Sequence, residues 1–315
     1  MAITTTPLPA DTGAEAVRRR LRGRRIDVGG VVLRVALLLS LTFSLLVLAV
    51  LLYDVVTGGW DVFASRFQSF MSGTLRFSAA ESGISQALRG TLWIGVFVVL
   101  LAFPLGIAAA LYLEEYAADN RVTRFIDVNI RNLAGVPSIV YGILGFTIFV
   151  KSLSALTGGR SVVAGGLTLA VLVLPLVIIT SAEAIRAVPD ELRQAGYGLG
   201  ATRWEVSRTQ VLPYAAPGIL TGTVLSLARA LGEAAPLILV GAVVGRLGSN
   251  PGLFDLGSLD QRFTALPIVI TYWAGLPQAD FRALTAAAIV VILVIVLLAN
   301  AAAILLRNRF ESKRG

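Results

Sequence analysis

Two charged residues, Arg229 and Glu233, interrupt the long apolar run from 217 to 244. A helix rises about 1.5 Å per residue and needs about 20 residues to cross a bilayer, so this run is long enough to span one. Arg229 falls close to its midpoint, where an uncompensated charge costs roughly 2.5–3.5 kcal/mol. Glu233 follows four residues later, on the same helical face, and can partly neutralise the guanidinium. The pair must therefore face inward.

Two roles are open for this pair. It can be a structural ion pair that holds two helices together. Alternatively, Arg229 meets an anion during its passage, and Glu233 orients the guanidinium or exchanges its hydrogen bonds. Arginine suits tetrahedral oxyanions because its planar fork makes bidentate contacts and keeps its charge. Intramembrane charges are functional by default, which favours the second role.

Small and polar residues extend the face that carries the pair. It continues backward to Gly222 and Ser226 and forward to Pro236, which has no N–H to donate to the carbonyl of Gly232. Small residues recur every four positions, at Gly218, Gly222, Ser226 and Ala230, so this ridge is expected to pack on another membrane helix. Ser226 is a candidate pathway residue.

Two further candidate pathway residues lie in the stretch from 133 to 146. Pro137 interrupts the helical hydrogen bonds there, and Ser138 and Tyr141 share a face. Their hydroxyls can line a pathway, or a neighbouring helix can satisfy them.

The composition is that of a membrane protein. Hydrophobic residues make up 56% of the 315-residue chain and charged residues only 15%, and the mean hydropathy is +0.79. Cysteine and histidine are both absent, which excludes disulfides, zinc sites and Cys or His nucleophile–base pairs. The two lysines, Lys151 and Lys313, do not follow a glycine. The chain therefore has no phosphate-binding lysine loop, and we expect no cofactor in it. Any ATP-driven work, with its ATP and Mg²⁺, would have to come from a partner.

Six apolar spans are predicted, an all-α integral membrane fold with both termini in the cytoplasm. The spans cover 31–53, 88–113, 132–150, 162–182, 217–244 and 283–306. The first is too long for the apolar core of a signal peptide and is expected to be retained. Of the 27 Lys and Arg residues, 18 fall in the expected cytoplasmic segments and eight in the outer ones. This bias, and the net charge of +8, fit the positive-inside rule.

Four regions follow from these spans. They are a basic cytoplasmic tail at 1–30, the first transmembrane helix with its outer loop at 31–84, a transmembrane domain at 85–306, and a cytoplasmic tail at 307–315. The last outer loop contains a semi-apolar piece at 266–275 that is too short to span and is expected to be re-entrant or interfacial.

The cytoplasmic connection from 183 to 214 is expected to dock a cytoplasmic partner. Asp190 can cap a short helix that begins near Glu191, with Pro189 at its entry, and glycines at 196, 198 and 200 are expected to end it. A second amphipathic piece runs from 203 to 211 and is expected to stop at Pro213.

This loop resembles the coupling loop of the membrane subunits of type I ABC importers. The family pattern is Glu-Ala-Ala, three residues, Gly, nine residues, Ile, any residue and Leu-Pro. Here Gln194-Ala195-Gly196, Gly200 and Leu212-Pro213 match its spacing, and Gln194, Gly196 and Gln210 depart from it. The resemblance implies the six-span, MetI-like fold, and implies that Glu191 or Arg193 shares the contact with the ATPase.

Four stretches, at 135–142, 199–213, 227–237 and 266–284, further resemble the PstA family of phosphate importer permeases. That resemblance implies a second permease subunit (PstC-like), an ATPase dimer (PstB-like) and an extracytoplasmic phosphate-binding protein (PstS-like). It places the chain in the bacterial cytoplasmic membrane and associates Arg229 and Glu233 with phosphate movement. The chain itself would be a transport subunit and not an enzyme.

Other functions remain open on the residues alone. A guanidinium does not separate phosphate from another oxyanion such as sulfate. A proton-coupled secondary transporter that uses Arg229 and Glu233 as a relay is a different class, although such folds usually show inverted repeats and none is evident here. A structural or signalling membrane protein has little use for a buried ion pair.

Overall fold

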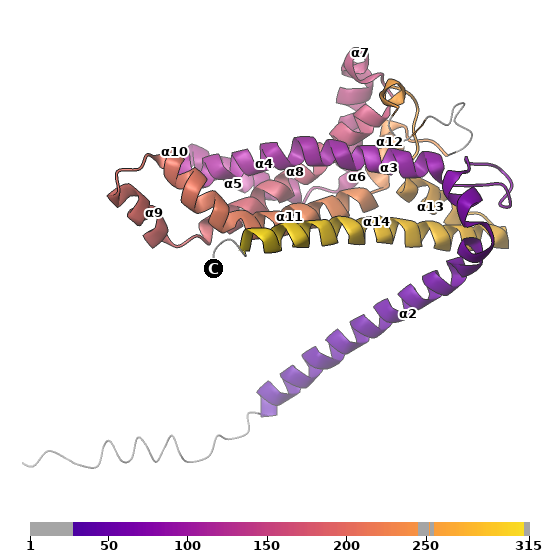
Figure 1. Ribbon diagram of the computed structural model, residues 1–315, viewed down its shortest axis with the longest axis horizontal. Coiled ribbons are helices and arrows are strands. Elements are labelled where there is room, and N and C mark those ends of the chain that lie inside the picture. The colour runs from indigo at the N-terminus through magenta and orange to yellow at the C-terminus, as the bar shows by residue number, and fades with distance from the viewer. Residues whose placement is uncertain (1–27, 245–251, 253–254, 312–315) are drawn as a thin grey trace, which may run out of the picture. The chain divides into compact units, whose positions relative to one another are not determined.

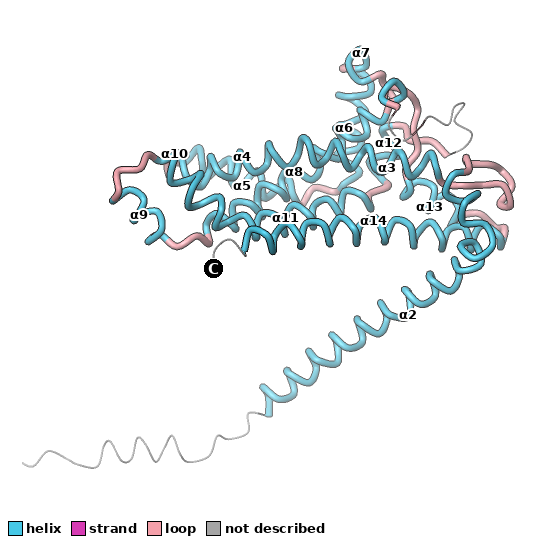
Figure 2. Tube along the Cα trace, in the orientation of Figure 1, coloured by secondary structure: helices cyan, strands magenta, loops and turns pink. Residues whose placement is uncertain are grey.

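The computed structural model describes residues 28–244, 252 and 255–311, and these described residues divide into two compact units between Asp54 and Val55. Helices and their connections make up these described residues, without a strand (Figure 2). The predicted all-α fold is confirmed.

Five helical segments in the described residues are long and apolar enough to cross a membrane, and a sixth span results if one bent pair is counted as a span. The five are α2 (Val28–Ser72), Ser85–Tyr116, α8 (Val162–Arg186), Arg203–Gly232 and α14 (Ala279–Glu311), and the bent pair is Arg121–Ala134 with Ser138–Ser152.

Two of these segments are built from several helical pieces. The pieces of the first are α3 (Ser85–Phe97), η1 (Val98–Ala102), α4 (Phe103–Leu111) and η2 (Tyr112–Tyr116), and those of the second are α10 (Arg203–Val206), η4 (Ser207–Val211) and α11 (Leu212–Gly232). The pieces η1, η2 and η4 are π-helical turns, which occur mostly as short bulges within α-helices.

The remaining elements are shorter. They are α5 (Arg121–Ala134), α6 (Ser138–Gly145), η3 (Phe146–Ser152), α7 (Ser154–Thr157), α9 (Asp190–Gly198), α12 (Ala235–Val240), η5 (Leu256–Ser258) and α13 (Leu266–Ala274).

The first unit consists, in its described part, of the beginning of α2. This part is a continuous apolar helix, and its side chains, such as Leu37 and Leu45, are exposed. The predicted span at 31–53 lies within it, but α2 continues to Ser72, with non-helical backbone at Arg66.

Helix α8 is the centre of the second unit. It is apolar on all sides and packs on α11, α4, α3 and α6. An all-round apolar helix is stable in this position because each of its faces has a neighbour. The small residues of α11 approach α8 closely, since a Cβ on Gly222 would lie 2.4 Å from Cβ of Thr180. The predicted ridge therefore does pack on a membrane helix, which is α8 of the same chain.

The third predicted span, 132–150, falls on a bent pair of helices, and the predicted interruption at Pro137 is confirmed. α5 and α6–η3 meet at an angle of 100° across Gly135–Pro137. Pro137 lacks the N–H that would continue the helical bonds, and it restricts the residue before it, so the chain turns here. In Figure 1, α6 and α7 consequently point away from the long axis of the bundle formed by α4, α8, α11 and α14.

The fifth predicted span, 217–244, is wrong in its continuity. α11 ends at Gly232, Glu233 has extended backbone (φ −80°, ψ 120°), and α12 begins at Ala235. Pro236 sits in the first turn of α12, where a missing N–H breaks no helical bond. Arg229 therefore lies in the last turn of α11 and not at the midpoint of a span.

Two details of the connection from 183 to 214 also differ from the prediction. The piece at 203–211 does not stop at Pro213 but runs directly into α11, because the π-turn η4 precedes the proline and Pro213 falls in the first turn of α11. Asp190 makes no capping bond, and its carboxylate instead accepts a hydrogen bond from Nη1 of Arg193 at 3.0 Å.

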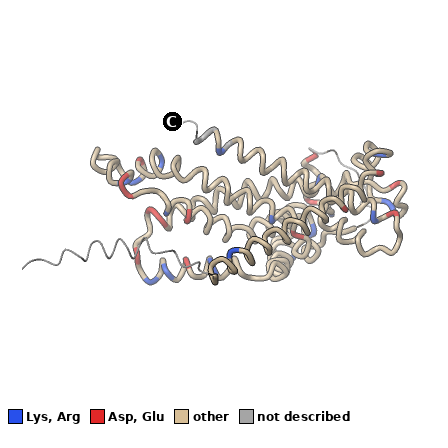
Figure 3. Tube along the Cα trace, turned by 90° about the horizontal axis from the view of Figure 1, so that it is seen from below, with Lys and Arg blue, Asp and Glu red and all other residues tan. Residues whose placement is uncertain are grey.

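The two ends of the second unit carry most of its described charged residues, and its middle is mostly uncharged (Figure 3). One end holds α9 and α10 and the other holds α13 (Figure 1). The semi-apolar piece that was expected to be re-entrant or interfacial forms α13, whose Leu266, Val269 and Trp273 are buried in a hydrophobic cluster with Phe281 of α14.

Candidate anion pathway and coupling segment

Arg229 and Glu233 form an ion pair in which Nε of Arg229 lies 3.5 Å from Oε1 of Glu233. This separation exceeds the usual range of an N–H···O hydrogen bond, so the contact is mainly Coulombic. The Arg229 side chain is 47% exposed and that of Glu233 is 20% exposed. Within the described part of the chain, the guanidinium donates no hydrogen bond. A loosely held, accessible guanidinium has its N–H groups available for another acceptor.

The pair lies at a helix break. α11 ends at Gly232, and Glu233 and Ala234 separate it from α12. Interrupted helices at membrane depth are tolerated where they are enclosed by protein or line a water-filled space, and such breaks form ion and substrate sites in transporters. The break is supported from one side by α6, because a Cβ on Gly142 would lie 2.8 Å from Cα of Pro236.

The other three predicted pathway residues are placed differently. Ser226 is buried, and its hydroxyl donates to the carbonyl of Gly222 at 2.9 Å. Tyr141 is also buried, and its hydroxyl donates to the carbonyl of Leu133 at 2.9 Å, across the bend between α5 and α6. Ser138 is half-buried at the start of α6. The hydroxyls of Ser226 and Tyr141 are thus satisfied by backbone, and a pathway role for these three residues stays a prediction.

The segment that is predicted to couple to an ATPase, residues 190–211 and here called the coupling segment, has an exposed outer face. Glu191, Gln194 and Ala195 of α9 are exposed. Gly196 faces inward, where a Cβ would lie 2.7 Å from Cγ2 of Val206. Gly200 has φ +82°, a left-handed conformation that glycine adopts without strain.

Large apolar side chains stand beside this face. Leu199 is 90% exposed, and Trp204 and Tyr197 are also exposed. Exposed apolar groups at the polar end of a bundle are typical of a protein contact surface. The residues predicted to couple, namely Glu191, Gln194, Ala195, Gly196 and Gly200, therefore lie on one short segment, but their role in docking stays a prediction.

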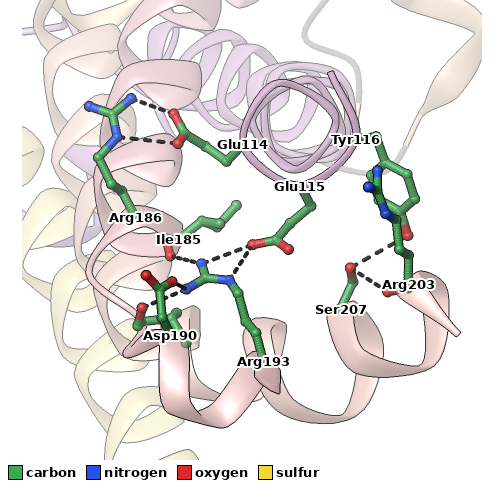
Figure 4. A network of polar contacts seen from close by, with 10 residues as sticks. Glu114, Glu115, Tyr116, Ile185, Arg186, Asp190, Arg193, Arg203 and Ser207 are labelled. Carbon is green, nitrogen blue, oxygen red and sulfur yellow. Dashed lines mark hydrogen bonds and ion pairs between the residues drawn. The ribbon is translucent and has the colours of Figure 1, made fainter. Parts of the chain in front are cut away.

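Arg193 points toward the body of the protein and not toward the exposed face. Its guanidinium contacts Glu115 of η2 and two backbone carbonyls at the end of α8 (Figure 4). Glu114 and Glu115 were not predicted as functional residues. A signal was present, since two adjacent glutamates directly follow an apolar span.

The structural role of Arg89, a buried arginine, was also not predicted. Arg89 of α3 donates to the carbonyl of Gly252 at 3.0 Å, to the carbonyl of Asp255 and to the hydroxyl of Ser258. It therefore ties the described part of the connection before α13 to the bundle.

Comparisons with known proteins agree with this architecture. Residues 102–312 match the model of the family described as binding-protein-dependent transport system inner membrane component. "Phosphate transport system permease protein PstA 1" of Mycobacterium tuberculosis is 41% identical over 209 residues, which cover 64% of this chain and 66% of that protein. The chain thus spans slightly less than two thirds of this relative.

Other relatives are covered to different extents. "Phosphate transport system permease protein PstA" of Yersinia pestis is 34% identical over 261 residues, covering 81% of this chain and 82% of that protein. "Probable ABC transporter permease protein YqgI" of Bacillus subtilis is 39% identical over 161 residues, covering 51% and 53%.

Solved structures share the fold. A bacterial alginate ABC transporter in complex with a pentasaccharide-bound periplasmic protein matches with a TM-score of 0.59 at 19% identity, covering 92% of this chain and 96% of that one. The inward-facing MetNI methionine ABC transporter matches with a TM-score of 0.55 at 18% identity, covering 72% and 94%. The MetI-like fold and the resemblance to PstA proteins are confirmed, and the chain is a multi-pass membrane protein that belongs to the family of binding-protein-dependent transport system inner membrane components.

Proposed function

We propose that this chain is the PstA-like permease subunit of an ATP-driven inorganic phosphate importer in the bacterial cytoplasmic membrane. It would form half of the translocation pathway with a PstC-like permease. A PstB-like ATPase dimer would hydrolyse ATP, and a PstS-like binding protein would deliver phosphate from outside. The names of the relatives and the family description support this assignment.

The observation that carries the proposal is the state of Arg229. Its guanidinium is half-exposed at a break in a membrane-length helical segment, with an ion partner but with its N–H donors unused within the described residues. Phosphate has the geometry that a guanidinium fork binds in bidentate fashion. Glu233 compensates the charge when the anion is elsewhere, so that the empty pathway does not hold a lone cation at low dielectric.

Transport would then proceed by alternating access. ATP-driven closure of the partner would move the exposed segment with Glu191, Gln194 and Ala195, while the chain itself supplies no catalytic group. Phosphate would pass Arg229 as a transient ligand. Because the contact with Glu233 is loose, the anion can replace the carboxylate and be replaced by it without a large barrier.

The test is uptake by the reconstituted complex. The chain is co-expressed with its second permease and ATPase, placed in liposomes and supplied with ATP and a binding protein. Phosphate accumulation that stops without ATP supports the proposal. Sulfate uptake that competes with phosphate would assign another oxyanion, and phosphate movement by this chain alone under a pH gradient would assign a proton-coupled secondary transporter. Either result overturns the proposal.

A further inference from the structure

Glu114 and Glu115 are adjacent at the end of the Ser85–Tyr116 span. Each accepts hydrogen bonds from an arginine of another element, one from α8 and one from α9 (Figure 4). Arg186, at the end of α8, donates to Glu114 from Nη2 at 2.5 Å and from Nε at 3.2 Å. Arg193, in α9, donates to Oε1 of Glu115 from Nη2 at 2.9 Å and from Nε at 3.1 Å. Both pairs join segments that lie more than 70 residues apart in the sequence.

The two pairs differ in burial. In the Arg186–Glu114 pair the side chains are 56% and 18% exposed, whereas in the Arg193–Glu115 pair they are 16% and 5% exposed. Water weakens the outer pair, and an exposed pair contributes little. The inner pair is largely removed from water, so the loss of one partner leaves a buried charge without compensation.

Arg193 also links the end of α8 to the start of α9. Its Nη2 donates to the carbonyl of Ile185 at 2.9 Å, and its Nη1 donates to the carbonyl of Val188 at 2.6 Å and to Asp190 at 3.0 Å. One guanidinium therefore joins the end of α8, the start of α9 and the π-turn η2. Such a hub fixes the orientation of α9 relative to η2 because the planar fork permits little rotation.

η2 also reaches the other half of the coupling segment. Oη of Tyr116 lies 3.4 Å from Oγ of Ser207 in η4, and Oγ of Ser207 donates to the carbonyl of Arg203 at 2.8 Å. α9 packs on α10 through Gly196 and Val206. The η2 end of the Ser85–Tyr116 span therefore contacts the coupling segment at two places, α9 and η4. The chain itself connects this segment only to α8 and α11.

We propose that the Glu115–Arg193 pair is the connection through which movement of α9 is passed to the Ser85–Tyr116 span. This inference rests on the proposed function and adds the internal receiver of the coupling movement. Both side chains are positioning residues. They do not contact substrate or nucleotide, and the face with Glu191, Gln194 and Ala195 is left free for the ATPase.

The experiment follows the movement of η2 directly and needs no assumption about the substrate. The chain has no cysteine, so Tyr112→Cys, at an exposed position of η2, introduces one thiol that can carry an environment-sensitive dye. In the assembled complex, ATP is expected to change the dye signal in this parent. Adding Arg193→Gln or Glu115→Gln is expected to reduce the change at least fivefold while ATP hydrolysis stays within about twofold. Adding both substitutions is expected to do no more than either one alone.

The neighbouring pair provides the matched control. Arg186→Gln removes an arginine that also makes two bonds to a glutamate but is exposed, and the dye response is expected to remain within about twofold of the parent. Arg193→Lys keeps the charge without the fork and is expected to retain an intermediate response, which keeps the test usable if Arg193→Gln does not assemble.

Two outcomes would overturn the inference. One is an unchanged dye response in Arg193→Gln and Glu115→Gln. The other is an equal loss of dye response, ATP hydrolysis and assembled complex, since this pattern indicates only a structural role. If the parent shows the dye response and its loss in the variants but imports no phosphate, the proposed function fails and the connection between α9 and η2 stands.

Discussion

Replacing Arg229 with Gln tests the proposed pathway most directly. The substitution keeps a hydrogen-bonding side chain at the end of α11 but removes the charge and the fork. The Arg229 side chain is 47% exposed and its contact with Glu233 is 3.5 Å long, so the loss of this pair should cost the fold only about 0–1 kcal/mol. Assembly of the complex is therefore expected to be normal.

The expected loss of transport is much larger. A hydrogen bond from a charged donor contributes about 1.5–3 kcal/mol, and about 1.4 kcal/mol corresponds to a factor of ten. Arg229→Gln should accordingly lower uptake by roughly 10- to 150-fold at phosphate concentrations below KM. Arg229→Lys keeps the charge and should lose less. Glu233→Gln leaves the guanidinium without its counter-ion, so phosphate should bind more tightly and leave more slowly, and KM and maximal rate should fall together.

The assay is ATP-dependent uptake of labelled phosphate by liposomes that contain the assembled complex. Arg131→Gln is a matched control, since Arg131 also forms an i,i+4 ion pair, with Asp127 at 3.0 Å, and both its side chain and that of Asp127 are about 40% exposed. This variant should transport normally. Uptake by Arg229→Gln at the level of Arg131→Gln would refute the reasoning, as would an equal loss in both.

Substitutions at three further positions test local features of the fold. Gly200→Val places a β-branched side chain at φ +82°, which costs roughly 1–2 kcal/mol or more, and it should uncouple ATP hydrolysis from uptake. Gly200→Asn should have a milder effect. Equal coupling in the two variants would contradict a conformational role for Gly200. Arg89→Met removes the hydrogen bonds to Gly252, Asp255 and Ser258 and should increase protease cleavage in the connection before α13. An unchanged cleavage rate would show that Arg89 does not hold this connection against the bundle. Thr202→Ala removes half of the capping box with Glu205 and should destabilise the start of α10 by about 1 kcal/mol. The measurement is amide hydrogen exchange at 203–206, which should become faster. Protection equal to that of the parent would show that the cap contributes little.

Much of the architecture was predictable because it depends on local composition. The positions of the apolar spans and of the coupling segment follow from hydrophobic length and from Pro and Gly positions, and the structure places helices in each of them. The break at Pro137 was predicted, and the errors concern the two prolines that lie in the first turn of a helix. Non-helical backbone at Glu233 separates α12, with Pro236, from α11, whereas the π-turn η4 runs directly into α11, with Pro213. The type of residue is the same, and the neighbouring backbone decides the result.

The site was predictable only in part. The pairing of Arg229 with Glu233 follows from a spacing of four residues and is confirmed. The sequence did not reveal that α11 ends between them, nor that Ser226 and Tyr141 direct their hydroxyls to backbone carbonyls.

The amino-acid sequence by itself determined that this is a helical membrane protein, which segments are apolar enough to span, and that Arg229 and Glu233 pair. These properties depend on the transfer of short apolar segments out of water, which each segment undergoes largely on its own. Only the tertiary structure decided that Arg193 turns inward to Glu115 and that α6 supports the break after α11. Such contacts join residues that are distant in the chain, and their energies depend on burial and on distances that exist only when the helices are packed together.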